Sequence, residues 1–154
     1  MTRTPPAEVA WDLPGKRPLS DAAVRRAVAA ALRFGGRPEA HLCVVFVDDA
    51  RLAEMHREHL GDPSPTDVIS FDLGDEHGGP AGELYVSVER ARAVALERGV
   101  EVARELALYV VHGALHLCGH DDRKPAARAR MRAAERAVLA SLGYPEDGAP
   151  HDAP

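Results

Sequence analysis

The sequence contains little that would cross-link the chain or place it in a membrane. Only 2 of its 154 residues are cysteines, Cys43 and Cys118, which excludes a disulfide scaffold and favours a reducing compartment. The apolar runs Leu42–Val47 and Leu106–Val111 are far shorter than the ~20 residues that cross a bilayer. Met1–Ala10 lacks the apolar stretch of a secretory signal. We therefore predict a soluble, cytoplasmic protein that contacts no membrane.

An excess of positive charge is also missing. The formal net charge is -5, from 19 Lys+Arg against 24 Asp+Glu, which argues against coating nucleic acid through bulk charge. Hydrophobic residues make up 45% and charged residues 28%, which is ordinary for a folded domain. The 8 histidines stand out, because histidine carries metal and proton chemistry near neutral pH.

The length suits a single domain, and the sequence has no internal repeat or linker. We place the domain at residues 7–144, between a disordered N-terminus at 1–6 and a disordered tail at 145–154. The tail is rich in Pro, Gly, Ala and acidic residues and has no apolar period.

Hydrophobic periodicity predicts an α+β fold, in which a small mixed β-sheet packs against helices. Strands are expected at Val9–Leu13, Leu42–Val47 (buried on both faces), Asp67–Leu73 and Gly82–Ser87. Helices are expected from Ser20 to Phe34, from a cap at Asp48 or Asp49 to about Glu58, from Val88 to Arg98, from about Val100 to Cys118 and from Pro125 to near Leu142.

Two histidines lie near the end of the fourth predicted helix. His112 and His116 are four residues apart, so on a helix they share one face, one turn apart. This spacing suits a shared metal ion, although a pair of polar residues on a solvated face would have it too. The helix is apolar almost all round, and a buried imidazole without a partner costs roughly 1–3 kcal/mol. We therefore favour the metal site.

A third ligand would come from the turn after this helix. His120 continues the same row, but along a straight helix it would lie ~12 Å from His112, whereas ligands of one zinc lie within about 4 Å of each other. If Gly119 ends the helix, Asp121 or Asp122 can return to the metal with an oxygen. We favour Asp122.

The stretch from His112 to Asp122 resembles the signature of the YbeY family of bacterial rRNA maturation endoribonucleases, H-G-x-L-H-L-x-G-Y-D-H. It departs at His120, where the family usually has Tyr, and at Asp122, where the family has its third metal-binding His. The resemblance thus implies one Zn²⁺ per chain, bound by His112, His116 and Asp122.

The resemblance covers roughly residues 40 to 143. Pro65–Phe71 is similar to the family's P-T-D-V-L-S-F strand, and Gly82–Ser87 to its G-D-I-x-I-S strand. Met131 and Glu135 match its M-x-x-x-E pattern. One departure is Leu60, at a position where many members have a basic residue.

This resemblance implies a zincin-like metallohydrolase fold and a single-strand-specific endoribonuclease. The expected activity is rRNA processing, at the 3′ end of small-subunit rRNA, together with ribosome biogenesis and quality control. The implied partners are ribosomal RNA, the small ribosomal subunit and its assembly factors. Two alternatives remain, a non-catalytic assembly factor with a structural zinc and a metallopeptidase-like hydrolase. The peptidase motif H-E-x-x-H needs a Glu base, and that position here is Gly113.

Several neighbouring residues could complete the site. His120 or Asp121 could move protons, although His120 could equally be an exposed turn residue. Thr66, Asp67 and Ser70 could line the cleft; alternatively Asp67 caps a turn and Ser70 points to solvent. Between Asp121 and Arg136 there are six basic residues against three acidic, and of these we assign phosphate binding to Arg123 and Lys124, although a solvated helix face would explain the run.

Overall fold

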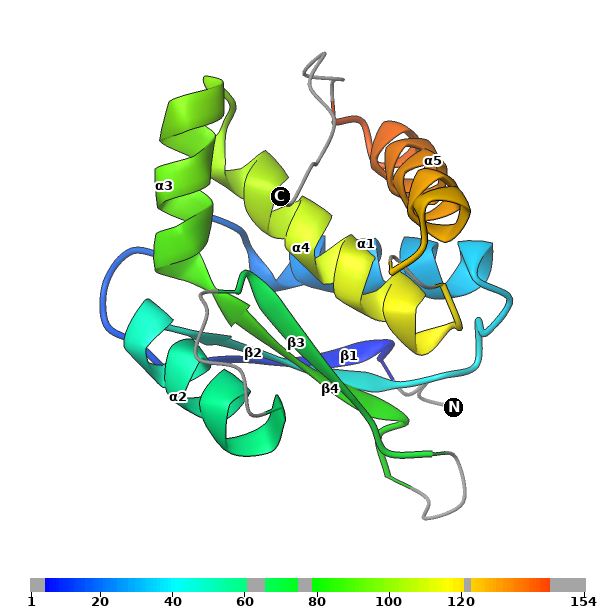
Figure 1. Cartoon of the computed structure of the whole chain (residues 1–154), viewed down its shortest axis with the longest axis horizontal. Coiled ribbons are helices and arrows are strands. Elements are labelled where there is room, and N and C mark those ends of the chain that lie inside the picture. The colour runs from blue at the N-terminus through cyan, green and yellow to red at the C-terminus, as the bar shows by residue number, and fades with distance from the viewer. Residues whose placement is uncertain (1–4, 61–65, 75–78, 121–122, 145–154) are drawn as a thin grey trace.

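Strands from both halves of the chain form one sheet. The computed structural model describes residues 5–60, 66–74, 79–120 and 123–144, and in these ranges four strands lie in the order β1-β2-β4-β3. Neighbouring strands β1, β2 and β4 are parallel, and β3 runs antiparallel to β4 (Figure 1). The strands are β1 (Ala7–Trp11), β2 (Leu42–Val47), β3 (Val68–Asp72) and β4 (Gly82–Ser87).

Helices cover both faces of the sheet. One face carries α1, α4 and α5, with α3 beside them, and α2 lies alone on the opposite face (Figure 1). Their bounds are α1 (Asp21–Phe34), α2 (Asp49–Leu60), α3 (Val88–Arg98), α4 (Val102–Leu117) and α5 (Pro125–Ser141).

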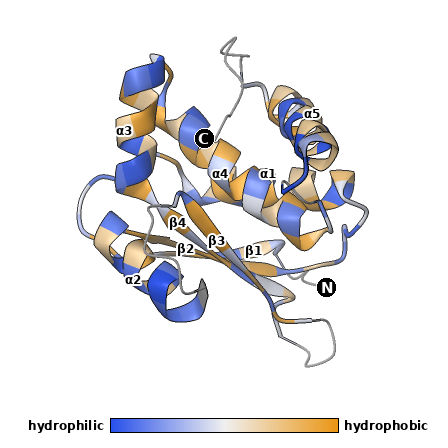
Figure 2. Cartoon of the chain, viewed as in Figure 1, coloured by the Kyte–Doolittle hydropathy of each residue, from blue (hydrophilic) through white to orange (hydrophobic). Residues whose placement is uncertain are grey.

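Helix α4 is the centre of the main core. Every residue from Arg104 to Val111 is buried, because α4 packs against β3, β4, α1, α3 and α5 at once. The apolar sides of the surrounding helices turn toward it and toward the sheet (Figure 2). A smaller apolar cluster joins α2 to the sheet: Leu52 and Met55 of α2 pack with Val47 of β2 and Ile69 of β3.

The predicted α+β class with a mixed sheet is confirmed, and β2, β4 and α3 have the predicted bounds. Strand β1 lies two residues earlier than predicted, because its register follows β2, with Ala7 opposite Leu42. The prediction that β2 is buried on both faces is wrong, since Cys43 and Val45 are half-exposed. Helix α2 packs further along that face, against Val47 and Ile69.

No helix of the described residues is long and apolar enough to cross a membrane.

Candidate metal centre

A tight turn ends α4 just after its two histidines. Cys118 caps the helix and Gly119 adopts φ +99°, a left-handed conformation that favours glycine. The Gly119 N–H donates to the His116 carbonyl at 3.1 Å, and the His120 N–H donates to the Leu115 carbonyl at 3.1 Å. These two bonds form a Schellman motif, which reverses the chain. His120 is therefore off the helical row of the other two histidines.

His112 and His116 lie on one face of α4, one turn apart. The His116 side chain is exposed, whereas that of His112 is 16% exposed. Nδ1 of His112 lies 2.5 Å from Oε2 of Glu135, a residue of α5 whose side chain is 3% exposed. In neutral imidazole, a carboxylate at Nδ1 holds the proton there and makes Nε2 the nitrogen that accepts a ligand.

This arrangement fits a metal. Metal-binding histidines usually donate their second ring N–H to a carboxylate, as His112 does to Glu135. Within the described residues no group of three His, Cys, Asp or Glu side chains is close enough to hold an ion. The predicted third ligand, Asp122, and its alternative, Asp121, lie outside the described residues. The ligand set thus stays a prediction.

Glu135 contacts His112, although the sequence pattern assigns it no role. It matches the M-x-x-x-E pattern, but its partner His112 lies 23 residues earlier in the chain. A local signal does exist: Met131, Glu135, Val138 and Leu139 are the buried stripe of α5, so an acidic residue occupies an apolar row. A buried carboxylate needs a partner, and α4 provides it.

Directly after His112, α4 packs closely on the sheet at Gly113. A Cβ atom there would lie 2.9 Å from Cδ2 of Leu84 and 3.2 Å from Oγ of Ser70. The Ser70 hydroxyl donates to the Gly113 carbonyl at 3.3 Å, so Ser70 faces α4 and not solvent. The position that carries the base in H-E-x-x-H therefore has no room for a side chain.

The remaining predicted residues lie on two sides of α4. The Asp67 carbonyl accepts a hydrogen bond from the Ser87 N–H, and Thr66 Oγ1 donates to the Val68 carbonyl. Burial, and after it the charges of Glu105 and Asp67, raise the pKa of Tyr109 in α4, which places Asp67 near that helix. On the other side, Arg123 and Lys124 are exposed just before α5.

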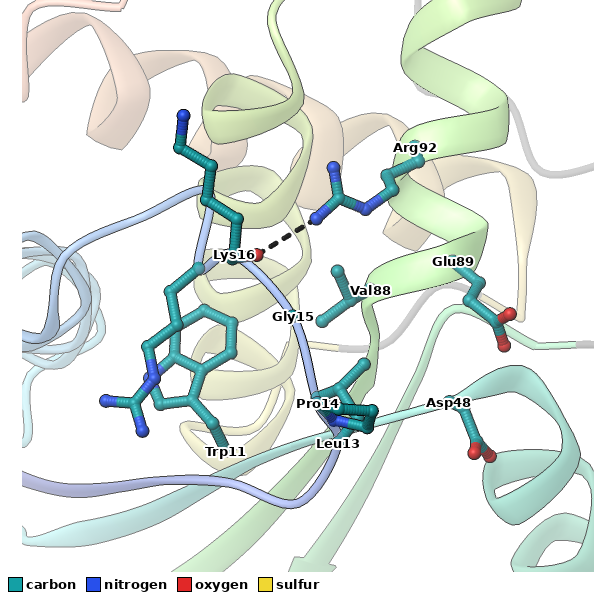
Figure 3. A pocket seen from close by; sticks show the side chains of 10 residues that line it. Trp11, Leu13, Pro14, Gly15, Lys16, Asp48, Val88, Glu89 and Arg92 are labelled. Atoms are coloured by element: carbon teal, nitrogen blue, oxygen red, sulfur yellow. Dashed lines mark hydrogen bonds between the residues drawn. The ribbon is translucent and has the colours of Figure 1, made fainter.

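A separate cavity of about 390 Å³ opens at the carboxyl ends of the three parallel strands (Figure 3). Trp11 stacks on Phe46 with 3.9 Å between ring centroids, and Arg92 donates to the Lys16 carbonyl at 3.0 Å. The end of α4 lies at the other end of β4, where a Cβ on Gly82 would meet Leu117 at 2.5 Å. Since β4 spans about 17 Å at ~3.3 Å per residue, this cavity is not part of the candidate centre.

Comparison with known proteins connects this geometry to one family. The family model described as "Endoribonuclease YbeY" matches residues 16–143. The Endoribonuclease YbeY of Desulfitobacterium hafniense is 40% identical over 115 residues, which cover 68% of this chain and 73% of the relative. That of Symbiobacterium thermophilum is 38% identical over 132 residues, covering 78% and 85%.

A solved structure has the same fold. The solution structure of the Thermotoga maritima protein TM1509 aligns with a TM-score of 0.58 at 21% identity, covering 93% of this chain and 99% of that one. At this level of identity the match establishes the fold alone.

Proposed function

The chain belongs to the YbeY family, and from that premise we propose that it is a zinc-dependent endoribonuclease that hydrolyses single-stranded RNA. The observation that carries the proposal is the contact between His112 and Glu135 at the end of α4. A buried carboxylate that fixes the proton on one ring nitrogen prepares the other for a metal. The curated relatives named above are both endoribonucleases.

The residues proposed to hold one Zn²⁺ are His112, His116 and Asp122, on a zincin-like arrangement of helix and turn. Zinc bound there would supply Lewis-acid catalysis and activate water for attack on a phosphodiester. Glu135 orients His112. We assign proton transfer to His120, whose N–H forms part of the Schellman motif, or to Asp121, the next residue in the sequence.

The RNA would lie along the exposed side of this helix end. Arg123 and Lys124 are exposed there and would bind phosphates, while Thr66 and Asp67 would flank the site from the start of β3. Ser70 bonds to the Gly113 carbonyl, so its role is to hold α4 on the sheet. The proposed setting is cytoplasmic: maturation of the 3′ end of small-subunit rRNA, with the small subunit and its assembly factors as partners.

Replacing an exposed ligand tests the activity without disturbing the core. His116→Ala should abolish cleavage of single-stranded RNA and reduce bound zinc, because it removes a proposed metal ligand. The His116 side chain is exposed, so the core should keep its packing. His56→Ala is the matched control, since it removes a histidine from α2 on the opposite face of the sheet. Cleavage that persists in His116→Ala would come from a contaminant.

The metal assignment has its own test. Asp122→Ala should lower bound zinc well below one per chain, as measured by metal analysis of purified protein, and full retention would exclude Asp122 as a ligand. Zinc retained at one per chain in unaltered protein that cleaves no RNA would instead support an assembly factor with a structural zinc. The close packing at Gly113 argues against the peptidase alternative, because a general base cannot be accommodated there.

A further inference from the structure

An aromatic side chain is exposed beside the candidate metal centre. Phe34, the last residue of α1, is 50% exposed, whereas the other Phe, Tyr and Trp residues are buried or half-buried. It continues the buried stripe of α1, since it follows Ala27 by seven residues and Ala31 by three, and both of these are fully buried. Phe34 therefore lies beyond the edge of the core, on the same face of α1 as these buried residues.

The position of Phe34 is fixed by the turn that follows it. A Cβ atom on Gly35 would lie 2.5 Å from the Cβ and Sγ atoms of Cys118, so the end of α1 rests directly on the end of α4 (Figure 1). Nη1 of Arg37 donates to the Leu117 carbonyl at 3.0 Å and ties the next turn to the same point. The backbone that follows Phe34 is thus anchored to the end of α4.

The ring of Phe34 faces the turn that carries the candidate site. Its centroid lies 6.3 Å from that of His120, with the two rings tilted by 39°. His120 is half-buried and stands four residues after the exposed His116. Exposed cations neighbour the two residues in the sequence: Arg33 precedes Phe34 on α1, and Arg123 and Lys124 follow His120 before α5.

An exposed aromatic ring among cations is the composition of a single-stranded nucleic-acid site. Every nucleobase has a π-face that can stack on such a ring, while cations bind the phosphates. A paired base is already stacked within its helix and cannot use the ring. We propose that Phe34, supported by His120, is the stacking residue for an unpaired base of RNA next to the scissile phosphate. This inference rests on the proposed RNA-cleaving function and gives it a source of single-strand selectivity.

The experiment measures stacking directly. A short single-stranded RNA that contains 2-aminopurine loses fluorescence when that base stacks on an aromatic ring. It is mixed with zinc-loaded protein, and quenching and affinity are read before cleavage, with a gel to show that the RNA is intact. Phe34→Ala and Phe34→Leu should remove the quenching and weaken affinity by about 5- to 150-fold, whereas Phe34→Trp should keep both. Leucine separates stacking from simple apolar contact.

Two controls separate this inference from the proposed function. Leu96→Ala removes an 85% exposed apolar side chain from α3, away from the site, and should leave quenching unchanged. Thermal unfolding followed by circular dichroism checks that the Phe34 variants are folded. Quenching in unaltered protein that disappears in Phe34→Leu supports the stacking residue even if no cleavage occurs. RNA cleavage with unchanged affinity and KM in Phe34→Leu overturns the stacking residue and leaves the nuclease intact.

Discussion

Each half of α4 is in contact with a buried carboxylate, and the two carboxylates differ in the side chains that they contact. In the first half, Glu105 is fully buried, with Oε1 at 3.5 Å from Nη1 of Arg98 and 4.0 Å from Nη1 of Arg104. In the second half, Glu135 reaches in from α5 and contacts Nδ1 of His112. Both carboxylates have cationic or proton-donating partners, and both are at most 3% exposed.

What differs is the partner. A guanidinium is always charged and has only donors, so neither Arg98 nor Arg104 can bind a metal. An imidazole has a second nitrogen, which becomes an acceptor when the first is hydrogen-bonded to a carboxylate. We therefore interpret the cluster at Glu105 as structural, whereas the pair at Glu135 is the contact that, under the proposed function, prepares His112 for a metal.

The largest expected effect is on stability, at the first carboxylate. Glu105→Ala leaves two arginine side chains, 16% and 8% exposed, without their buried partner. Removing one member of a buried ion pair typically costs 3–5 kcal/mol, so we expect a loss of about 3–5 kcal/mol in the free energy of unfolding, measured in urea. Glu101→Ala, at an exposed cap with no side-chain hydrogen bond, should cost about 0.5 kcal/mol or less. A loss under 1 kcal/mol for Glu105→Ala would mean that both arginines simply turn to solvent.

The second carboxylate should affect the metal more than the fold. Glu135→Gln keeps the shape but removes the charge that fixes the His112 proton, so zinc affinity should fall about 10- to 100-fold, measured by competition with a chelating dye. The matched variant Glu105→Gln should leave zinc affinity unchanged, because its carboxylate contacts arginines. If both variants weaken zinc equally, the distinction between the two halves of α4 is wrong.

The sequence predicts best those parts of the fold that contacts between neighbouring residues determine. Ser20 caps α1 with its own hydroxyl on the Ala23 N–H, and Gly99 ends α3 in a left-handed conformation, so these bounds were readable from neighbouring residues. The position of β1 was not, because pairing with β2 decides which residues join the sheet. Local signals thus set these two helix ends, whereas pairing with β2 sets the ends of β1.

The candidate site divides in the same way. The spacing of His112 and His116 on one helix is a local pattern, and the sequence was sufficient to identify it. The roles of Glu135 and Phe34 depend on α5 and α1 meeting the end of α4, which no spacing along the chain encodes. Asp121 and Asp122 lie outside the described residues, so the choice between them stays a prediction from sequence.

The smallest expected effect is on the free energy of unfolding, at Gly113 in the second half of α4. There the helix packs closely on the sheet, and we expect no role in chemistry. Gly113→Ala places a methyl group 2.9 Å from Leu84 and 3.2 Å from Ser70 Oγ. Overpacking costs about 1–3 kcal/mol, and the higher helix propensity of alanine returns about 1 kcal/mol, so the net loss in unfolding free energy should be about 0–2 kcal/mol.

Adding Ser70→Ala removes the closest polar atom, so the double variant should lose less unfolding free energy than the two single losses added together. Zinc affinity should stay unchanged in all three variants, because the close contacts of Gly113 and the hydrogen bond of Ser70 are made with the sheet and not with the proposed metal. A fall in zinc affinity in Gly113→Ala without a loss of stability would show that the sheet side of α4 also sets the histidine geometry.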